Sequence, residues 1–214
     1  MTSAKDKSIE TVFIVDDDEA IRAGLSDLLE SAGLRTQEYS SAEQFLEVWN
    51  PEIAGCLVLD VRLPGMSGME LQSQLAESGV GLPVIIMTAH GDMPMVRKAL
   101  KAGAVEFLIK PFQDAELLAA VEEAFVLDRS RRHEEEILQS VQSRVDSLTE
   151  RERQVMGLVT AGLTNKEIAE KIFLSVVTVK LHRSQVMRKM QAKSLADLVK
   201  MSEWLGKSSS SGAS

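Results

Sequence analysis

The chain has very little cysteine and no long apolar stretch. Its 214 residues include a single cysteine, Cys56, which excludes a disulfide bond within the chain. Because no metal-ligating residues accompany Cys56 in the sequence, we interpret it as a small buried hydrophobic residue rather than a redox thiol. No apolar run is long enough to cross a bilayer, and the segment MTSAKDKSIE lacks the apolar centre of a secretion signal. We therefore expect a soluble, cytoplasmic protein with no membrane partner.

Acidic and basic residues are distributed unevenly along the chain. Residues 1–128 contain 22 Asp and Glu against 9 Lys and Arg, a net charge of −13. Residues 129–214 contain 10 against 15, a net charge of +5. A basic region is attracted to the phosphates of nucleic acid, whereas an acidic region repels them and can hold a cation. The length suits two domains, and the charges predict different partners for them.

Short apolar runs in the first half alternate with helical patterns. The runs, rich in β-branched or aromatic residues, are 11–15, 56–59, 83–87 and 105–109. Helical periodicity follows at 18–31, 41–48, 67–77, 93–102 and from 114 onward. Capping boxes are expected at two helix starts, Ser40 with Glu43 and Ser67 with Glu70. This alternation predicts an α/β fold with five βα units around a parallel sheet.

Polar side chains stand where the predicted strands end. They are Asp16, Asp17, Asp60, Thr88 and Lys110. Since the carboxyl ends of parallel strands meet at one edge of the sheet, we expect these side chains to lie together. Taken one at a time, each has a simpler explanation as a turn, a helix cap or a loop residue.

The three carboxylates predict a cation site and a nucleophile. Two carboxylates about 4 Å apart repel each other by roughly 4 kcal/mol at an effective dielectric near 20, and a hard cation such as Mg²⁺ relieves that repulsion. Asp60 stands alone at its strand end, so it is the predicted nucleophile towards a phosphoryl group. Asp16 and Asp17 are better placed to hold metal, while Thr88 and Lys110 can bind phosphoryl oxygens.

From residue 149 onward the sequence predicts helices and no strands. The four expected helices are 149–161, 164–172, 175–190 and 194–204. Their starts carry capping residues: Thr149 with Glu152, Thr164 with Glu167, Ser175, and Ser194 with Asp197. Cations gather on and just after the third helix, at Lys180, Arg183, Arg188, Lys189 and Lys193. Its apolar residues Val179, Val186, Met187 and Met190 predict a buried side, which leaves a basic side suited to the DNA major groove or simply to water.

A long helix is predicted to connect the two halves, because no glycine or proline interrupts the pattern after Asp114. It carries an apolar stripe at Val121, Ala124, Ile137, Val141 and Val145. Two interpretations stay open, a charged solvated linker and a dimerising coiled segment. We place the domains at 9–128 and 147–206, with a helical linker at 129–146 and a disordered tail at 207–214.

Four segments of the first half, FIVDDDEAIR, LVLDVRLPGMSGMEL, IIMTAHGD and AGAVEFLIKPF, resemble the receiver domain of two-component response regulators. The resemblance implies a flavodoxin-like doubly wound fold in which Asp60 is the phosphoacceptor. It implies Mg²⁺ held by Asp16, Asp17, Asp60 and the backbone carbonyl of Arg62, with Thr88 and Lys110 sensing the phosphate and Phe107 as the switch aromatic. It also implies that the side chains of Arg62 and His90 tune the phosphate lifetime. Dimerisation is implied for residues 92–102 and 105–125, with Met95, Val96 and Ala99 as contacts and Lys98 and Lys101 at the edge.

The second half resembles the helix-turn-helix domain of the NarL/FixJ/LuxR type, through LTERERQVMGLVTAGLTNKEIAEKI and TVKLHRSQVMRKM. The resemblance implies that Lys180, Leu181 and Ser184 face base edges. It implies that phosphates are positioned by Thr178, His182, Arg183, Asn165 and Lys166. Val176 and Val177 depart from the polar residues common at this helix start, so we interpret them as contacts for thymine methyl groups. Phe173 stands where a small or polar residue is usual, and we expect it to pack beneath the turn.

Together, the two halves resemble a FixJ-branch transcription regulator rather than an enzyme. The implied partners are a sensor histidine kinase, double-stranded promoter DNA, RNA polymerase and a second copy of the chain after phosphorylation. Two alternatives are a regulator that acts through protein contacts alone and a phosphatase with an aspartate nucleophile. The phosphatase is disfavoured because Arg62, and no acid/base carboxylate, stands two residues beyond Asp60.

Overall fold

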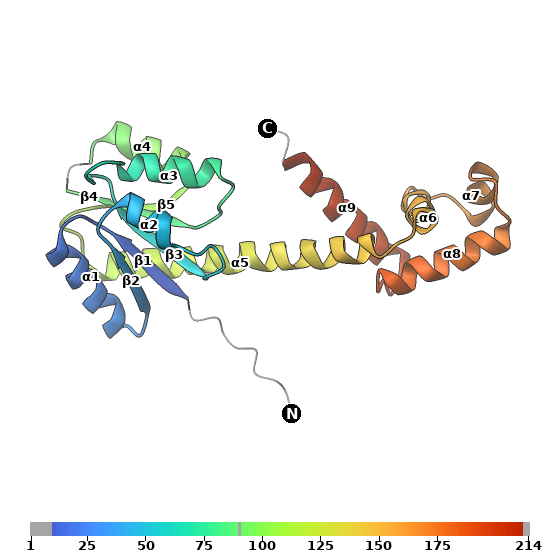
Figure 1. The fold of residues 1–214 in the computed structure, drawn as a ribbon, viewed down its shortest axis with the longest axis horizontal. Coiled ribbons are helices and arrows are strands. Elements are labelled where there is room, and N and C mark those ends of the chain that lie inside the picture. The colour runs from blue at the N-terminus through green and yellow to red at the C-terminus, as the bar shows by residue number, and fades with distance from the viewer. Residues whose placement is uncertain (1–9, 90, 212–214) are drawn as a thin grey trace, which may run out of the picture. The chain divides into compact units, whose positions relative to one another are not determined.

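The computed structural model describes residues 10–89 and 91–211, with side chains up to residue 205. The chain forms two compact units, Met1–Arg132 and His133–Ser214 (Figure 1). Within the described residues, no helix combines the length and the apolar character needed to cross a membrane.

The first unit is built on a five-stranded sheet in the order β2-β1-β3-β4-β5, with every neighbouring pair parallel. The strands are β1 Thr11–Val15, β2 Arg35–Tyr39, β3 Gly55–Asp60, β4 Val84–Thr88 and β5 Ala104–Ile109. This order is the flavodoxin-like one, and it confirms the predicted fold class. The apolar runs did not reveal β2, because this edge strand has the polar sequence RTQEY and only Tyr39 is buried.

Helices cover both faces of the sheet (Figure 1). They are α1 Glu19–Ser31, α2 Ala42–Val48, α3 Gly68–Glu77, α4 Met93–Lys101 and α5 Asp114–Asp146. Successive residues of β1 point to opposite faces, so Phe13 packs with α2, α3 and α4 while Ile14 packs with α1 and α5. Cys56 is fully buried on the second of these faces, as predicted, and burial raises the pKa of its thiol.

Helix starts follow the predicted caps with one exception. Ser67 and Glu70 form the expected capping box at α3. The box predicted for Ser40 and Glu43 is wrong, because α2 begins one residue later and Ser41 caps it by accepting a hydrogen bond from the Gln44 N–H. The N–H of Ser40 instead donates to the side-chain oxygen of Gln44.

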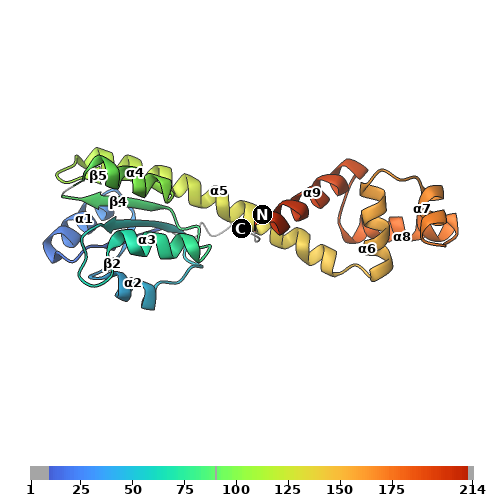
Figure 2. The ribbon, with the colours of Figure 1, turned by 90° about the horizontal axis from the view of Figure 1, so that it is seen from above.

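The second unit contains the C-terminal part of α5 and four further helices (Figure 2). These are α6 Glu150–Thr160, α7 Asn165–Lys171, α8 Val176–Lys189 and α9 Leu195–Ser211. Helix α9 continues to Ser211, into the segment 207–214 that was expected to be disordered; residues 212–214 lie outside the described part.

The apolar stripe of α5 is covered by the chain itself. Val121 and Ala124 belong to a core of the first unit. Val141 belongs to the core of the second unit, and Ile137 and Val145 pack against that core. The stripe therefore offers little apolar surface to a partner helix, which disfavours the dimerising coiled segment.

A buried carboxylate fixes α5 to the first unit. Asp128 is 1% exposed and accepts hydrogen bonds from the Gly55 N–H at 3.0 Å, from Arg131 at 2.6 Å and from Arg132 at 2.8 Å. Arg132 also donates to the carbonyl oxygens of Pro51, Glu52 and Ile53. Gly55 begins β3 and Asp60 ends it, so this charge network lies at the opposite end of the strand from the predicted nucleophile.

Candidate functional site

The predicted polar residues meet at the carboxyl edge of the sheet. Asp16 follows β1, Asp60 ends β3, Thr88 ends β4 and Lys110 follows β5. Strands β1 and β3 are neighbours, and the chain crosses to opposite faces of the sheet on either side of them. This is the topological switch point at which doubly wound sheets bind their ligands.

Lys110 joins the two buried carboxylates. Its Nζ lies 2.6 Å from Asp16 Oδ2 and 2.8 Å from Asp60 Oδ1. Burial lowers the pKa of Lys110, but its hydrogen bonds and charge interactions with Asp16 and Asp60 outweigh burial and leave the pKa above its ordinary value. Lys110 is thus a fixed cation shared by two anions, and one negative charge remains in excess.

The free oxygens of both carboxylates are held by backbone N–H groups. Asp16 Oδ1 accepts from the Asp18 N–H at 2.9 Å, and Asp60 Oδ2 accepts from the Arg62 N–H at 2.6 Å. Asp18 in turn caps α1 by accepting from the N–H groups of Ala20 and Ile21. Asp17 is exposed at the rim of this group. Among the residues that the structure describes, no three acidic, histidine or cysteine side chains lie close enough to hold a metal ion.

Thr88 ends β4 next to Asp60, and Phe107 lies on the neighbouring strand β5. Met87 is paired in register with Asp60, which places Thr88 beside the end of β3, and Thr88 is fully buried. Phe107 is half-buried and packs against the core that contains α4. A Cβ on Gly91 would lie 2.9 Å from the Phe107 ring, so glycine leaves room for this aromatic side chain. His90, the other position expected to tune the phosphate, lies outside the described residues.

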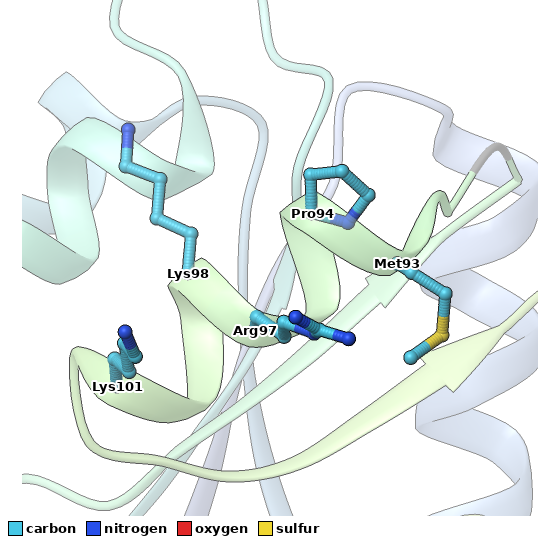
Figure 3. A pocket seen from close by; sticks show the side chains of 5 residues that line it. All are labelled: Met93, Pro94, Arg97, Lys98 and Lys101. Atoms are coloured by element: carbon cyan, nitrogen blue, oxygen red, sulfur yellow. The ribbon is translucent and has the colours of Figure 1, made fainter.

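The outer face of α4 carries three cations beside exposed apolar side chains (Figure 3). Met93, Pro94, Arg97, Lys98 and Lys101 line a shallow pocket there. Of the three apolar contacts expected on this helix, Ala99 is fully buried and cannot contact a partner, whereas Met95 and Val96 are half-buried. The helix period turns Ala99 inward, and the large apolar residues exposed on α4 are Met93 and Leu100.

Helix α8 presents its predicted basic side to solvent. Val179, Val186 and Met190 are fully or almost fully buried, and Met187 packs against the same core. The three residues expected at base edges, Lys180, Leu181 and Ser184, are all exposed. Helix α7, joined to α8 by a short turn, packs against it and caps its own start with the predicted box of Thr164 and Glu167.

The residues expected to position phosphates differ in exposure. Lys166 is exposed, whereas Thr178, His182, Arg183 and Asn165 are half-buried. Arg183 donates to the Asn165 side-chain oxygen at 3.1 Å, so these two residues connect α8 to α7. The hydroxyls of Thr178 and Ser175 lie 2.8 Å apart at the start of α8, where Ser175 provides the predicted cap.

Phe173 does not pack beneath the turn as expected. Its side chain is 92% exposed, and its backbone has a positive φ of 55°. The turn projects the ring into solvent because Leu174 and Ile172, on either side, take the places in the core.

Both halves of the chain match known families. Residues 12–122 match the response regulator receiver domain, and residues 146–202 match the bacterial regulatory proteins of the luxR family. Nodulation protein W of Bradyrhizobium diazoefficiens is 47% identical over 205 residues, which cover 96% of this chain and 89% of the relative. The transcriptional regulatory protein FixJ of Rhizobium meliloti is 43% identical over 192 residues, which cover 89% and 94%.

The chain belongs to the two-component response regulators. It joins a receiver domain to a LuxR-type helix-turn-helix domain, as the sequence predicted. Among solved structures, the response regulator StyR has a TM-score of 0.83 and 48% identity, covering 91% of this chain and 98% of that chain. Full-length FixJ from B. japonicum has a TM-score of 0.56 and 40% identity, covering 94% and 99%. The chain is therefore a DNA-binding transcription regulator of the receiver-controlled type.

An ion pair in the helix-turn-helix domain joins α6 to α8. Glu152 forms the predicted capping box with Thr149, and the same carboxylate accepts from Lys189 at 2.6 Å. Lys189 also donates to the Ser147 carbonyl oxygen. The sequence predicted that Lys189 faces DNA. In the structure Lys189 instead fixes the C-terminal end of α8 to Glu152 and Ser147. The Lys189 hydrogen bond, followed by the Thr149 N–H, lowers the pKa of Glu152 to about 2.

We expect Glu152→Gln to destabilise the helix-turn-helix domain by about 1–3 kcal/mol at neutral pH, because it removes a charge-assisted hydrogen bond from a buried side chain. The lowered pKa adds stability that is fully present above the ordinary carboxyl pKa of about 4.3. This contribution is lost as the pH falls towards about 2. The difference in unfolding free energy between wild type and variant should therefore shrink below about pH 4.

Urea unfolding of chains that all carry Trp49→Phe measures this difference by fluorescence, because the remaining tryptophan, Trp204, packs against the core of the helix-turn-helix domain. Glu150→Gln on the same helix is the matched control, since Glu150 is exposed. A difference between wild type and Glu152→Gln that stays constant from neutral to acid pH contradicts the assigned ion pair.

Several functional contacts were not apparent in the sequence. The network around Asp128 joins residues 51–55 to 128–132, and no local pattern pairs such distant segments. Only the spacing of Asp128 and Arg132, four residues apart on one helix, was a usable signal. The contact of Gly91 with Phe107 likewise depends on the receiver fold.

Proposed function

We propose that Asp60 accepts a phosphoryl group from a sensor histidine kinase. The observation that supports this most directly is the shared hydrogen bonding of Lys110 with Asp16 and Asp60 at the switch point of the sheet. Asp60 is 6% exposed, which keeps its carboxylate at the surface of the pocket but largely free of bulk water. A buried carboxylate held by an ammonium and a backbone N–H is oriented for attack in a single direction.

In the proposed step a carboxylate oxygen of Asp60 attacks the phosphorus of the donor phosphohistidine. The bond from phosphorus to the imidazole nitrogen breaks, and its electron pair stays on the imidazole. The product is an acyl phosphate on Asp60. The ammonium of Lys110, already 2.8 Å from Asp60 Oδ1, is placed to bind a phosphoryl oxygen. Thr88, at the end of the neighbouring strand, is the proposed hydroxyl donor.

We propose that Asp16, Asp17, Asp60 and the backbone carbonyl of Arg62 hold Mg²⁺. The donor types fit this ion because they are all oxygens and because the buried carboxylates exceed the charge of Lys110 by one. Asp17 would have to turn inward to join Asp16 and Asp60 around the ion, since the three are not close together in the structure. Mg²⁺ bound there would neutralise the negative charges of the carboxylates and of the phosphoryl group. Asp17 lies at the exposed rim, so we assign the two buried carboxylates the larger share of binding.

Phosphorylation is proposed to change the surface around α4. Thr88 moves towards the phosphate, and Phe107, which packs on the same core as α4, fills the space behind it. The exposed surface affected includes Met93, Arg97, Leu100 and Lys101, and we propose that a second copy of the chain docks there. The resulting homodimer places a second recognition helix on the DNA.

The proposed output is promoter binding by paired α8 helices in the cytoplasm, with RNA polymerase as a further partner. Lys180, Leu181 and Ser184 are assigned to base edges, and Lys166, Asn165, Thr178, His182 and Arg183 to phosphates. A single phosphorylation event fits this site better than phosphatase turnover, because Arg62 stands where an acid/base carboxylate is needed. We place the functional boundaries at 9–128, 129–146 and 147–206; Ile9 lies outside the described residues.

The salt dependence of DNA binding tests the proposed dimer. After treatment with acetyl phosphate and Mg²⁺, a dimer with roughly 6–10 phosphate contacts should lose about 10³–10⁵ in affinity between 50 and 200 mM salt. The untreated chain, binding as a monomer, should lose much less. Affinities for a selected genomic fragment, measured by fluorescence anisotropy over this range, give both slopes. An identical slope in the two states contradicts phosphorylation-driven dimerisation, and no retention of any fragment favours a regulator that acts through protein contacts alone.

A further inference from the structure

An apolar cluster occupies the DNA-facing end of α8. Phe173, Val176, Val177 and Leu181 are 92%, 39%, 76% and 59% exposed. Apolar side chains gathered on an exposed surface indicate a place where a partner binds. We call these four residues the apolar cluster.

The apolar cluster lies on the same face of α8 as its exposed cations. At about 100° of rotation per residue, one arc of roughly 140° contains Val176, Val177, Lys180, Leu181, Ser184 and Arg188. The opposite side of the helix is occupied by Val179, Val186 and Met190, which are buried in the core. Helix α8 contains no acidic residue. A face that mixes apolar groups with cations and excludes acids is complementary to a polyanion that also displays apolar groups.

Phe173 is the most exposed member of the apolar cluster. It has a left-handed backbone with φ of 55°, a conformation that is unusual for a bulky residue. Glycine and asparagine adopt this conformation more readily, and they would avoid exposing an aromatic ring to water. The backbone conformation ends α7, where the Leu174 N–H donates to the Ala169 carbonyl oxygen at 3.0 Å. The exposure of the ring is the unfavourable feature that a ligand would offset.

We propose that the apolar cluster reads the C5-methyl groups of thymines in the DNA half-site. This inference rests on the proposed entry of α8 into the major groove. In that groove the thymine methyl is the apolar group on the base edges, and residues at the N-terminal end of a recognition helix reach those edges. Val176 and Val177 begin α8, and Leu181 follows one turn later. Phe173, in the preceding turn, extends the contact beyond the helix.

A protein partner is the competing occupant of this surface. The DNA is favoured because Lys180 and Arg188 flank the apolar residues on one face, and because exposed Lys166 lies on the adjacent helix of the same motif. The half-site should accordingly contain thymines that face the cluster. Removal of one buried methyl group should weaken binding about four-fold.

Replacement of thymine by deoxyuridine tests the proposal, because it removes the methyl group and leaves the base-pairing pattern unchanged. The full-length chain, treated with acetyl phosphate, first selects its site from a random duplex library. Each thymine of the selected site is then replaced singly, and the dissociation constant is measured by fluorescence anisotropy. We expect about four-fold weaker binding at two or more thymines of each half-site.

Two variants identify which side chain reads which methyl group. Val177→Ala and Phe173→Asn should each abolish the difference between thymine and deoxyuridine at one position while the other positions keep theirs. Asparagine tolerates the left-handed backbone, so Phe173→Asn should fold, and circular dichroism checks this. Val48→Ala in the receiver, also at an exposed valine, is the control and should leave every difference unchanged.

Three outcomes overturn the inference. Equal binding of thymine and deoxyuridine at every position excludes methyl readout. If the variants weaken binding to the thymine and deoxyuridine duplexes equally, the side chains contact DNA without reading the methyl group. Unchanged DNA binding with lost transcription in a purified RNA polymerase assay assigns the cluster to a protein partner. If the chain binds no DNA at all, the proposed function fails as well. The three outcomes above leave DNA binding in place and overturn only the inference about the apolar cluster.

Discussion

Asp60→Asn is expected to reduce acid-labile phosphate uptake to background. The substitution removes the attacking carboxylate oxygen and leaves an amide, which is a poor nucleophile. The fold should survive, because Lys110 keeps its 2.6 Å hydrogen bond to Asp16 and the asparagine oxygen can still accept from the Arg62 N–H. Incubation with radiolabelled acetyl phosphate and Mg²⁺, followed by acid and alkaline treatment of the labelled protein, measures the effect.

The same variant should lose the phosphorylation-dependent part of DNA binding. Its affinity in the presence of acetyl phosphate should equal that of the untreated wild type, since the shift to the dimer depends on the acyl phosphate. Asp27→Asn, an identical substitution on the exposed side of α1, is the control and should take up phosphate like wild type. Label that persists on the Asp60→Asn variant assigns the nucleophile to another residue.

Asp128→Ala is expected to destabilise the receiver domain by about 3–5 kcal/mol, because it removes the buried carboxylate that pairs with both Arg131 and Arg132. The side chains of Arg131 and Arg132 are 28% and 23% exposed, so water replaces the lost carboxylate only in part. The Gly55 N–H, at the start of a fully buried strand, also loses its acceptor. The midpoint of thermal unfolding of the receiver should fall by about 10 °C or more.

Differential scanning calorimetry of the full chain can report this loss, because two domains need not unfold in one transition. Asp128→Asn should lie between wild type and Asp128→Ala, since the amide oxygen still accepts from Gly55 while the charge is gone. Glu123→Ala on the exposed side of α5 is the matched control and should change stability little. A loss below about 1 kcal/mol for Asp128→Ala means that the arginines find other partners and that the network is not an anchor.

The parts of the fold that the sequence predicted are those with a local cause. Strands β1, β3 and β4 are buried on both faces, so each contains a nearly continuous apolar run. Edge strand β5, AVEFLI, is predictable because most of its residues are apolar, although Glu106 and Ile109 are exposed. Edge strand β2 faces solvent along much of its length, and its sequence RTQEY resembles a loop. The start of α2 was misplaced by one residue because Ser40 and Ser41 are both competent caps and only packing chooses between them.

In the candidate site, too, the sequence predicted the features with a local cause and missed those that depend on packing. The positions of Asp16, Asp60, Thr88 and Lys110 followed from the rule that strand ends meet at one edge of a parallel sheet. The burial of Ala99 and the exposure of Phe173 depend on how a helix and a turn are rotated against a core, and no spacing in the sequence specifies that. The roles of Lys189 and Asp128 likewise arise from partners that are distant along the chain.

The full burial of Cys56 has a practical consequence for studying this regulator. Its thiol is inaccessible and has a raised pKa, and the sequence contains no second cysteine. Maleimide dyes therefore find no ready target on the native chain. A cysteine engineered at an exposed position outside the assigned DNA contacts, such as Ala161 after α6, would carry a single fluorophore. Arrival of the helix-turn-helix domain at an oligonucleotide can then be followed in real time without first replacing the native cysteine.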